Sequence, residues 1–179
     1  MKISRSTTIN APLEKLWAVF VDDFVPVHLW MASIKNSTPM TKGTQVAGSP
    51  AIGRVAEIGA GSPGGLMVEQ ITKVDAKAKV IEFDTELQNI KGFNPIIGWP
   101  NRVTLEAQGN ATKITWEIRP RLKTIGLPLY FPVKKSLGAG FVRSLEEIKA
   151  YVETDQPHPR KAKAFEAEAM TGGLAKAAV

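Results

Sequence analysis

Between residues 66 and 118 the chain alternates apolar and polar side chains, and only short turns separate the alternating runs. In the run 77–87, for example, Ile81, Phe83 and Thr85 alternate with charged residues. This period of two is typical of a strand with one buried face. The connections are too short for parallel crossovers, which need about a dozen residues or more. The sequence therefore predicts an antiparallel sheet.

Turn residues and further strand-like runs extend this sheet to about seven strands. Gly109 and Asn110 join two alternating runs into a hairpin. A turn-rich break at 59–65 precedes the first alternating run. Runs with strand composition are Ile3–Ile9, Ile34–Pro39, Ala51–Ile58 and Leu66–Val74.

Apolar residues at helical spacing occur in the sequence both before and after the predicted strands. A short helix is expected after Pro12, which suits a first helical turn because it lacks an N–H, and a second short helix after Pro26. Residues 133–154 predict a long amphipathic helix, with Glu146 and Glu147 on its polar face. An antiparallel sheet closed by one long helix gives an α+β fold.

The length of 179 residues suits a single domain. We expect this domain to span residues 1–154. The remainder, 155–179, is rich in alanine and charge and has too few large apolar residues for a core. It is expected to be a loosely ordered tail or a short helix, with 161–170 as the helical candidate.

Composition excludes several classes of protein. The chain has no cysteine and only two histidines, so it offers no disulfide, no thiolate nucleophile and no multi-histidine metal centre. No cofactor is expected. No apolar run is long enough for a membrane span and the N-terminus lacks signal-peptide features, which favours a cytoplasmic protein. The net charge of +6 is spread along the sequence, unlike the clustered charge of a nucleic-acid-binding surface.

Several short segments, taken in order, are similar to a known superfamily. The segments are Ile9-Asn10-Ala11-Pro12 followed by Trp17, Asp23-Phe24 with Trp30 and Ile34, Gly53-Arg54, Glu69 with Asp75, and Thr112 with Trp116. Over residues 3–154 the chain resembles the START/polyketide-cyclase-like superfamily (SRPBCC). The sequence departs from that pattern over 122–137, a Pro-rich lead-in to the long helix.

The resemblance implies a helix-grip fold, in which a curved antiparallel sheet wraps around the long C-terminal helix. Few side chains reach the wide end of such a sheet, so an apolar cavity is expected there. The resemblance also implies binding of a small hydrophobic molecule, such as a lipid, a polyketide or an aromatic metabolite, for transport, sequestration or sensing. Two alternatives stay open, a cyclase or dehydratase acting in the same cavity and a module that stimulates chaperones. The oligomeric state stays open as well.

Aromatic residues are the candidates for the cavity wall, although each also suits plain core packing. They are Trp30, Phe83, Phe93, Trp99, Trp116, Tyr130 and Phe141. The polar candidates are Arg54 and Glu69, which face each other if their strands are neighbours. This pair either orients a ligand and exchanges protons with it or, as favoured, forms an exposed cross-strand ion pair.

Two further features have both a functional and a structural interpretation. His28 could act as a general base near the cavity opening, but no nucleophile accompanies it, so a histidine on a helix surface is favoured. No catalytic residue is assigned. A basic cluster either attracts an acidic ligand or lipid headgroups or, as favoured, forms a solvated rim. It comprises Arg119, Arg121, Lys123, Lys134 and Lys135.

Overall fold

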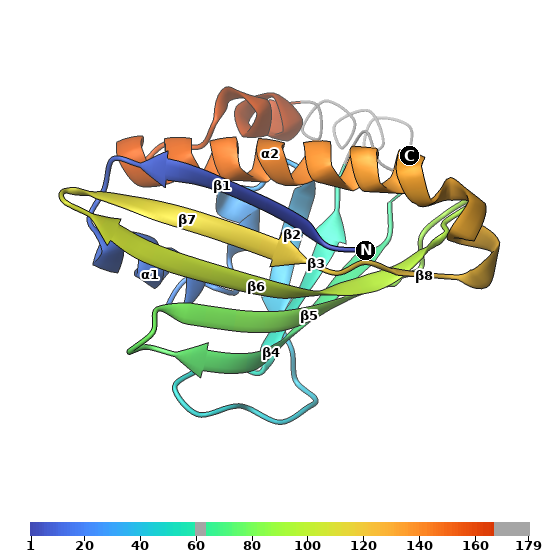
Figure 1. The fold of residues 1–179 in the computed structure, drawn as a ribbon, viewed down its shortest axis with the longest axis horizontal. Coiled ribbons are helices and arrows are strands. Elements are labelled where there is room, and N and C mark those ends of the chain that lie inside the picture. The colour runs from blue at the N-terminus through green and yellow to red at the C-terminus, as the bar shows by residue number, and fades with distance from the viewer. Residues whose placement is uncertain (60–63, 167–179) are drawn as a thin grey trace, which may run out of the picture.

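The computed structural model describes residues 1–59 and 64–166, which form a curved sheet, a long helix and several shorter helices (Figure 1). The labelled helices are α1 (Leu13–Phe20), the 3₁₀ helices η1 (Val27–Leu29) and η2 (Thr124–Leu129), and α2 (Tyr130–Thr154). The strands are β1 (Ile3–Ile9), β2 (Ile34–Pro39), β3 (Gly53–Ile58), β4 (Leu66–Asp75), β5 (Val80–Gln88), β6 (Ile96–Gln108), β7 (Ala111–Ile118) and β8 (Arg121–Leu122).

The strands pair antiparallel in the order β1-β7-β6-β5-β4-β3-β2, and the short β8 adds to β6. From β2 to β7 each strand pairs with the next in the sequence, whereas β1 crosses to the far end and pairs with β7. The predicted antiparallel sheet and its α+β element order are confirmed, as is the hairpin that turns at Gly109. Residues 60–63 of the predicted turn between β3 and β4 lie outside the described residues.

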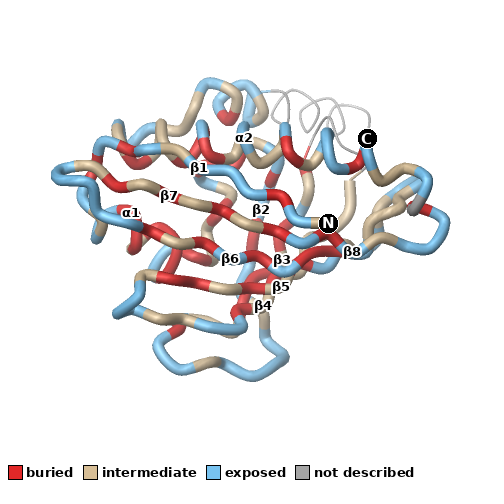
Figure 2. Tube along the Cα trace, in the orientation of Figure 1, coloured by how far each residue is buried: buried red, intermediate tan, exposed pale blue. Residues whose placement is uncertain are grey.

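Helix α2 lies along β1 and over the inner face of the curved sheet (Figure 1). Its apolar stripe of Leu145, Ile148 and Val152 is buried, with at most 3% of each residue exposed. Buried residues recur along the strands and on one side of α2, as Figure 2 shows. This arrangement is the helix grip that the resemblance implies.

Two glycines let neighbouring strands approach closely in the middle of the sheet. A Cβ on Gly53 of β3 would lie 2.0 Å from the backbone O of Glu69. A Cβ on Gly98 of β6 would lie 2.0 Å from the backbone O of Thr85. Any larger residue at either position would push these strands apart. The two glycines therefore allow the close approach of β3 to β4 and of β6 to β5.

The helices differ in extent from the sequence-based expectations. The second short helix is a three-residue 3₁₀ turn, η1, with Pro26 before it. Helix α2 begins at Tyr130, earlier than predicted. Pro132 does not prevent this start, because it falls in the first turn, where a missing N–H breaks no helical hydrogen bond. The Pro-rich lead-in forms β8 and η2. None of the described helices is long and apolar enough to cross a membrane.

Part of the predicted tail packs against the domain. The structure describes 155–166 of this tail, and residues 159–166 form a short helix beside α2 (Figure 1). Arg160 Nε donates to Glu147 Oε1 of α2 (2.9 Å). Lys161, which is 1% exposed, donates from Nζ to the backbone O of Ile34 in β2 (2.5 Å). The remainder of the candidate helix, 167–170, lies outside the described residues.

Ending the chain at Gln156 should lower the free energy of unfolding by about 1–3 kcal/mol, because the buried Glu147 carboxylate would lose its Arg160 donor. Urea denaturation of the shortened and the full chain measures this difference. In the full chain, Arg160→Met should reproduce most of the loss. Lys163→Met, at an exposed position of the same short helix, serves as the control. Superimposable unfolding curves for the shortened and full chains would contradict a stabilising contact between the short helix and α2.

Candidate ligand-binding site

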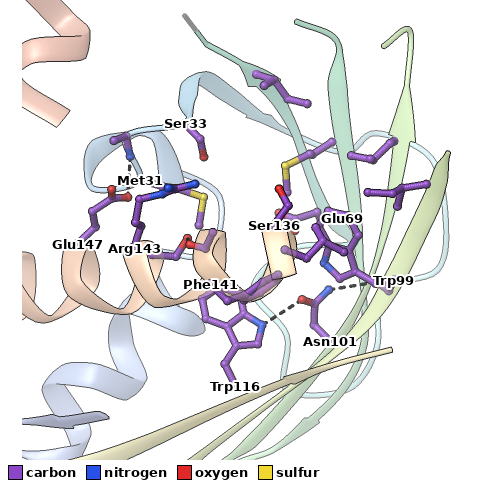
Figure 3. A pocket seen from close by; sticks show the side chains of 18 of the residues that line it. Met31, Ser33, Glu69, Trp99, Asn101, Trp116, Ser136, Phe141, Arg143 and Glu147 are labelled. Carbon is purple, nitrogen blue, oxygen red and sulfur yellow. Dashed lines mark hydrogen bonds between the residues drawn. The ribbon is translucent and has the colours of Figure 1, made fainter. Parts of the chain in front are cut away.

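A cavity of about 650 Å³ lies between the inner face of the sheet, α2 and the C-terminal short helix (Figure 3). Pockets for small molecules usually measure roughly 300–1,000 Å³. The cavity reaches the surface, because the exposed residues Ser33, Ser136 and Arg143 are among those that line it. The aliphatic and thioether part of its wall is formed by Met31, Ile58, Met67, Leu87, Ile90, Ile96 and Leu137.

Three aromatic rings complete the apolar wall. The ring of Phe141, from α2, stands edge-on to Trp116 of β7 (5.1 Å between centroids) and to Trp99 of β6 (6.1 Å). Trp116 also makes edge contacts with the core rings of Phe20 (5.6 Å) and Phe83 (6.2 Å). Such contacts contribute about 0.5–1.5 kcal/mol each beyond the buried area. The core behind the wall therefore holds these rings in place.

A row of polar side chains crosses the floor of the cavity. Arg54, Glu69 and Thr85 face one another directly across β3, β4 and β5. Arg54 Nε donates to Glu69 Oε2 (2.5 Å), and Thr85 Oγ1 donates to Glu69 Oε1 (2.9 Å). None of the three residues is more than 4% exposed. Arg54 also donates to the backbone O of Phe24 and lies 4.1 Å from the centroid of its ring.

Asn101 extends this row to β6. Its Nδ2 donates to Thr85 Oγ1 (2.8 Å) and to the backbone O of Phe83 (3.2 Å), and its Oδ1 accepts from Trp116 Nε1 (3.0 Å). An indole N–H can only donate, so Trp116 fixes which end of the amide is oxygen. The hydrogen bonds then run in one direction, from Trp116 through Asn101 and Thr85 to the carboxylate of Glu69.

The side-chain donors of Thr85, Asn101 and Trp116 are used within the protein, while acceptor positions remain on Glu69 and Asn101. The Thr85 hydroxyl, the Asn101 amide N–H groups and the Trp116 indole all donate to atoms of the row or of the backbone. A carboxylate offers about four lone-pair positions, and Arg54 and Thr85 occupy two of those on Glu69. Glu69 and Asn101 both line the cavity. The floor therefore presents hydrogen-bond acceptors to a ligand.

A second buried carboxylate, that of Glu147, lies on the other side of the cavity (Figure 3). It is 4% exposed and accepts from Arg160 Nε and from the backbone N–H of Ala32 (3.0 Å). The expectation that Glu147 lies on a solvated face of the long helix is therefore wrong. Arg160 and the segment around Ala32 cover this part of α2. Arg160 also donates to Glu146 Oε2 (2.7 Å), which fixes the short helix at the cavity edge.

The structure places some of the predicted ligand-binding residues at the cavity and others in the core. Those that line the cavity are Glu69, Trp99, Trp116 and Phe141. Trp30 and Phe83 are core residues, 3% and 1% exposed. The predicted pairing of Arg54 with Glu69 is confirmed, but the favoured interpretation of an exposed ion pair is wrong. The two residues point to the inner face of the sheet, where Arg54 lies behind Glu69.

Two predicted wall residues lie elsewhere, and one polar residue escaped prediction. Phe93 is 65% exposed on the β5–β6 connection, and Tyr130 packs against Phe131 (5.2 Å between centroids) at the start of α2. Neither lines the cavity. Asn101 is the missed member of the floor. Its position two residues after Trp99, in an alternating run, was the available signal.

His28 lies on η1 and does not line the cavity. Its Nδ1 is 2.8 Å from Ser37 Oγ, which donates its own proton to the backbone O of Val25. The imidazole proton therefore resides on Nδ1. Burial, and next the positive charge of Lys161, lower the pKa of His28. Within the described ranges no group of three or more histidine, aspartate or glutamate side chains could hold a metal ion.

Comparison with known proteins adds to this geometry. Residues 1–153 match the family described as polyketide cyclase / dehydrase and lipid transport. The chain belongs to this family. The resemblance inferred from the sequence is thereby confirmed, and membership is consistent with binding of hydrophobic ligands or with a cyclase-like role. A search of curated proteins finds no match.

Solved structures share the fold at low sequence identity. Ara h 8.0201 is 16% identical with a TM-score of 0.67, over 85% of this chain and 97% of that one. A START superfamily protein from Mycobacterium smegmatis is 15% identical with a TM-score of 0.64, over 85% and 97%. The di-domain ARO/CYC BexL from the BE-7585A biosynthetic pathway is 11% identical with a TM-score of 0.62, over 84% of this chain but 47% of that one. This chain thus corresponds to about half of BexL.

Removing either partner of the Arg54–Glu69 pair should lower the free energy of unfolding by about 3–5 kcal/mol, because a buried charge would be left without its counter-ion. We expect Arg54→Met and Glu69→Gln each to show this loss in urea denaturation. The double variant should be more stable than either single variant, since no unpaired charge remains.

The exposed pair Lys35–Glu57, on the neighbouring strands β2 and β3, provides the control. Lys35→Met and Glu57→Gln should each cost less than about 1 kcal/mol. Additive losses in the Arg54–Glu69 double variant would contradict the paired arrangement.

Proposed function

We propose that this protein binds a small hydrophobic molecule in the cavity beneath α2. The observation that carries the proposal is the space of about 650 Å³ lined by the rings of Trp99, Trp116 and Phe141 and by aliphatic side chains. Protein interiors otherwise pack without such voids. An apolar molecule that fills the space gains roughly 25 cal/mol for each Å² of apolar surface removed from water. Family membership supports the same function.

The polar floor narrows the class of ligand. Glu69 and Asn101 line the cavity and offer acceptors, while the side-chain donors of Thr85, Asn101 and Trp116 are already used. A ligand hydroxyl or phenol directed at the floor would complete the free acceptor positions. A ligand carboxylate there would meet the negative charge of Glu69, which is unfavourable in a buried site. The ligand class that fits best is therefore a hydrophobic molecule with a hydroxyl or phenolic group at its buried end.

A second candidate function, a cyclase or dehydratase, is favoured by one specific observation. Glu69 is a buried carboxylate that faces the cavity, and a carboxylate in this position could accept a proton from a bound hydroxyl or an acidic C–H group. Holding a flexible substrate in a productive conformation also accelerates such reactions. Mass spectrometry of a bound compound before and after incubation separates the two functions, because binding alone returns it unchanged.

Filling the cavity should abolish binding without unfolding the protein. Gly140 lies on α2 and lines the cavity, and a Cβ at this position would meet no atom within 4 Å apart from its chain neighbours and the backbone of its own helix. Gly140→Leu therefore directs a large side chain into the open space. It should weaken the binding of N-phenyl-1-naphthylamine at least about tenfold. Stability should be unchanged or rise by up to about 1 kcal/mol, because glycine disfavours helix.

Ala139→Leu is the matched control, because Ala139 is exposed on the neighbouring position of the same helix and does not line the cavity. Fluorescence titration measures binding of the probe, and urea denaturation measures stability. If the Gly140 variant binds the probe as tightly as the Ala139 variant, or if the unaltered protein does not bind it, the proposed function fails.

A further inference from the structure

The most exposed large apolar side chains gather at one end of the molecule. Phe131, Ile125 and Phe93 are 78%, 68% and 65% exposed, and Ile97 is 41% exposed. Leaving such side chains in water forfeits the free energy of their burial, so a cluster of them marks a contact surface. We call these four residues, together with Lys91, Lys123, Lys134 and Lys135, the apolar–basic tip.

The fold joins two segments that are distant in the sequence to make this tip. Strand β8 pairs with the start of β6, with Ile96 opposite Leu122, and the backbone N–H of Lys123 donates to the O of Pro95 (2.9 Å). Gly126 of η2 packs so closely on Pro95 that a Cβ would lie 2.7 Å from the proline side chain. Helix α2 follows η2 without a break. Both segments lie at the right-hand end of Figure 1.

The two segments that form the tip carry only basic charged residues, while Asp84 and Glu86 of the adjacent strand β5 lie beside Arg121. Neither segment 88–100 nor segment 119–143 contains an aspartate or a glutamate. Their basic residues are Lys91, Arg119, Arg121, Lys123, Lys134, Lys135 and Arg143, which outnumber the net charge of +6 of the whole chain. The β6–β8 pairing therefore brings together two segments whose charged residues are all basic.

The lysines of the tip are available and stand beside its apolar side chains. Arg121 is paired with Asp84 (2.8 Å), but Lys91, Lys123, Lys134 and Lys135 form no ion pair with any residue that the structure describes. On α2, Lys134 and Lys135 follow Phe131 by three and four positions, which places all three on one helix face. An apolar side chain flanked by lysines on one face suits insertion at the boundary of an anionic bilayer.

The tip also adjoins the cavity. Ile90 and Asn94, from the connection that carries Phe93, line the cavity together with Ile96 at the start of β6, and so do Ser136 and Leu137 of α2. A surface that contacts the tip is therefore close to the residues through which a ligand would pass.

We propose that the apolar–basic tip docks this protein on the surface of membranes that contain anionic lipids. Phe131, Ile125 and Phe93 enter the boundary between headgroups and acyl chains, while the lysines lie among the negatively charged headgroups. A bilayer satisfies both features over the whole tip, since it presents apolar depth below a layer of negative charge. Docking does not depend on what the cavity holds, so it can fail or succeed separately from the proposed ligand binding.

Co-sedimentation with vesicles tests the proposal on the full chain without added ligand. The protein should bind vesicles of phosphatidylcholine with about 30% phosphatidylserine and remain in the supernatant with phosphatidylcholine alone. Lys134→Gln with Lys135→Gln should lower the partition coefficient about 30-fold, which corresponds to about fivefold for each lysine. Phe131→Ser should lower it about tenfold.

Matched variants separate the tip from general charge and apolarity. Lys42→Gln with Lys77→Gln changes the net charge equally at exposed positions outside the tip, and Leu29→Ser removes an exposed apolar residue from η1. Both should bind vesicles as the unaltered protein does. Equal losses in the control variants would overturn the proposal, as would no binding to anionic vesicles. Sedimentation velocity without vesicles detects self-association, and a dimer abolished by Phe131→Ser together with absent vesicle binding would overturn docking in favour of a second copy of the chain.

Discussion

The burial of the Glu69 carboxylate is the constraint on which the rest of this structure depends. A charge removed from water needs a counter-ion and hydrogen-bond donors, and Arg54 and Thr85 supply them from the two adjacent strands. This requirement fixes the register of β3, β4 and β5, because a slip of one residue would turn all three side chains to the opposite face. Gly53 and Gly98 allow the close strand contacts on either side of the row.

This row of polar side chains also positions the aromatic wall of the cavity. Asn101 and Trp116 continue the hydrogen bonds across β6 and β7, and the indole ring then meets Phe141 of α2. Helix α2 is thus held by an aromatic contact at one part of the cavity and, at another, by the hydrogen bond from the backbone N–H of Ala32 to Glu147. Each buried carboxylate that lines the cavity is matched to an arginine, so the polar groups are satisfied while apolar space remains between them.

The sheet could be predicted from the sequence because its signals are local. Alternation over Ile81, Phe83 and Thr85 identifies a strand without reference to anything distant, and the short turns dictate antiparallel pairing. Glu147 was misplaced because its partner, Arg160, lies in a segment whose composition resembles a tail. Lys123, Lys134 and Lys135 of the tip were named in the basic cluster, but their association with the exposed apolar residues was missed for a related reason. Phe93 and Phe131 are far apart in the sequence, and only the β6–β8 pairing brings their segments together.

The central claim, that the cavity accepts an apolar molecule whose donor faces the acceptors of Glu69 and Asn101, is tested most directly with two ligands of nearly equal shape. Calorimetric titration compares 2-naphthol, which carries a donor, with 2-methylnaphthalene, which carries none. A hydrogen bond to a charged acceptor contributes about 1.5–3 kcal/mol, so 2-naphthol should bind at least about tenfold more tightly, although the methyl compound is the more hydrophobic. Equal or tighter binding of 2-methylnaphthalene would contradict the role assigned to Glu69 and Asn101, and no binding of either compound would contradict the cavity's proposed function.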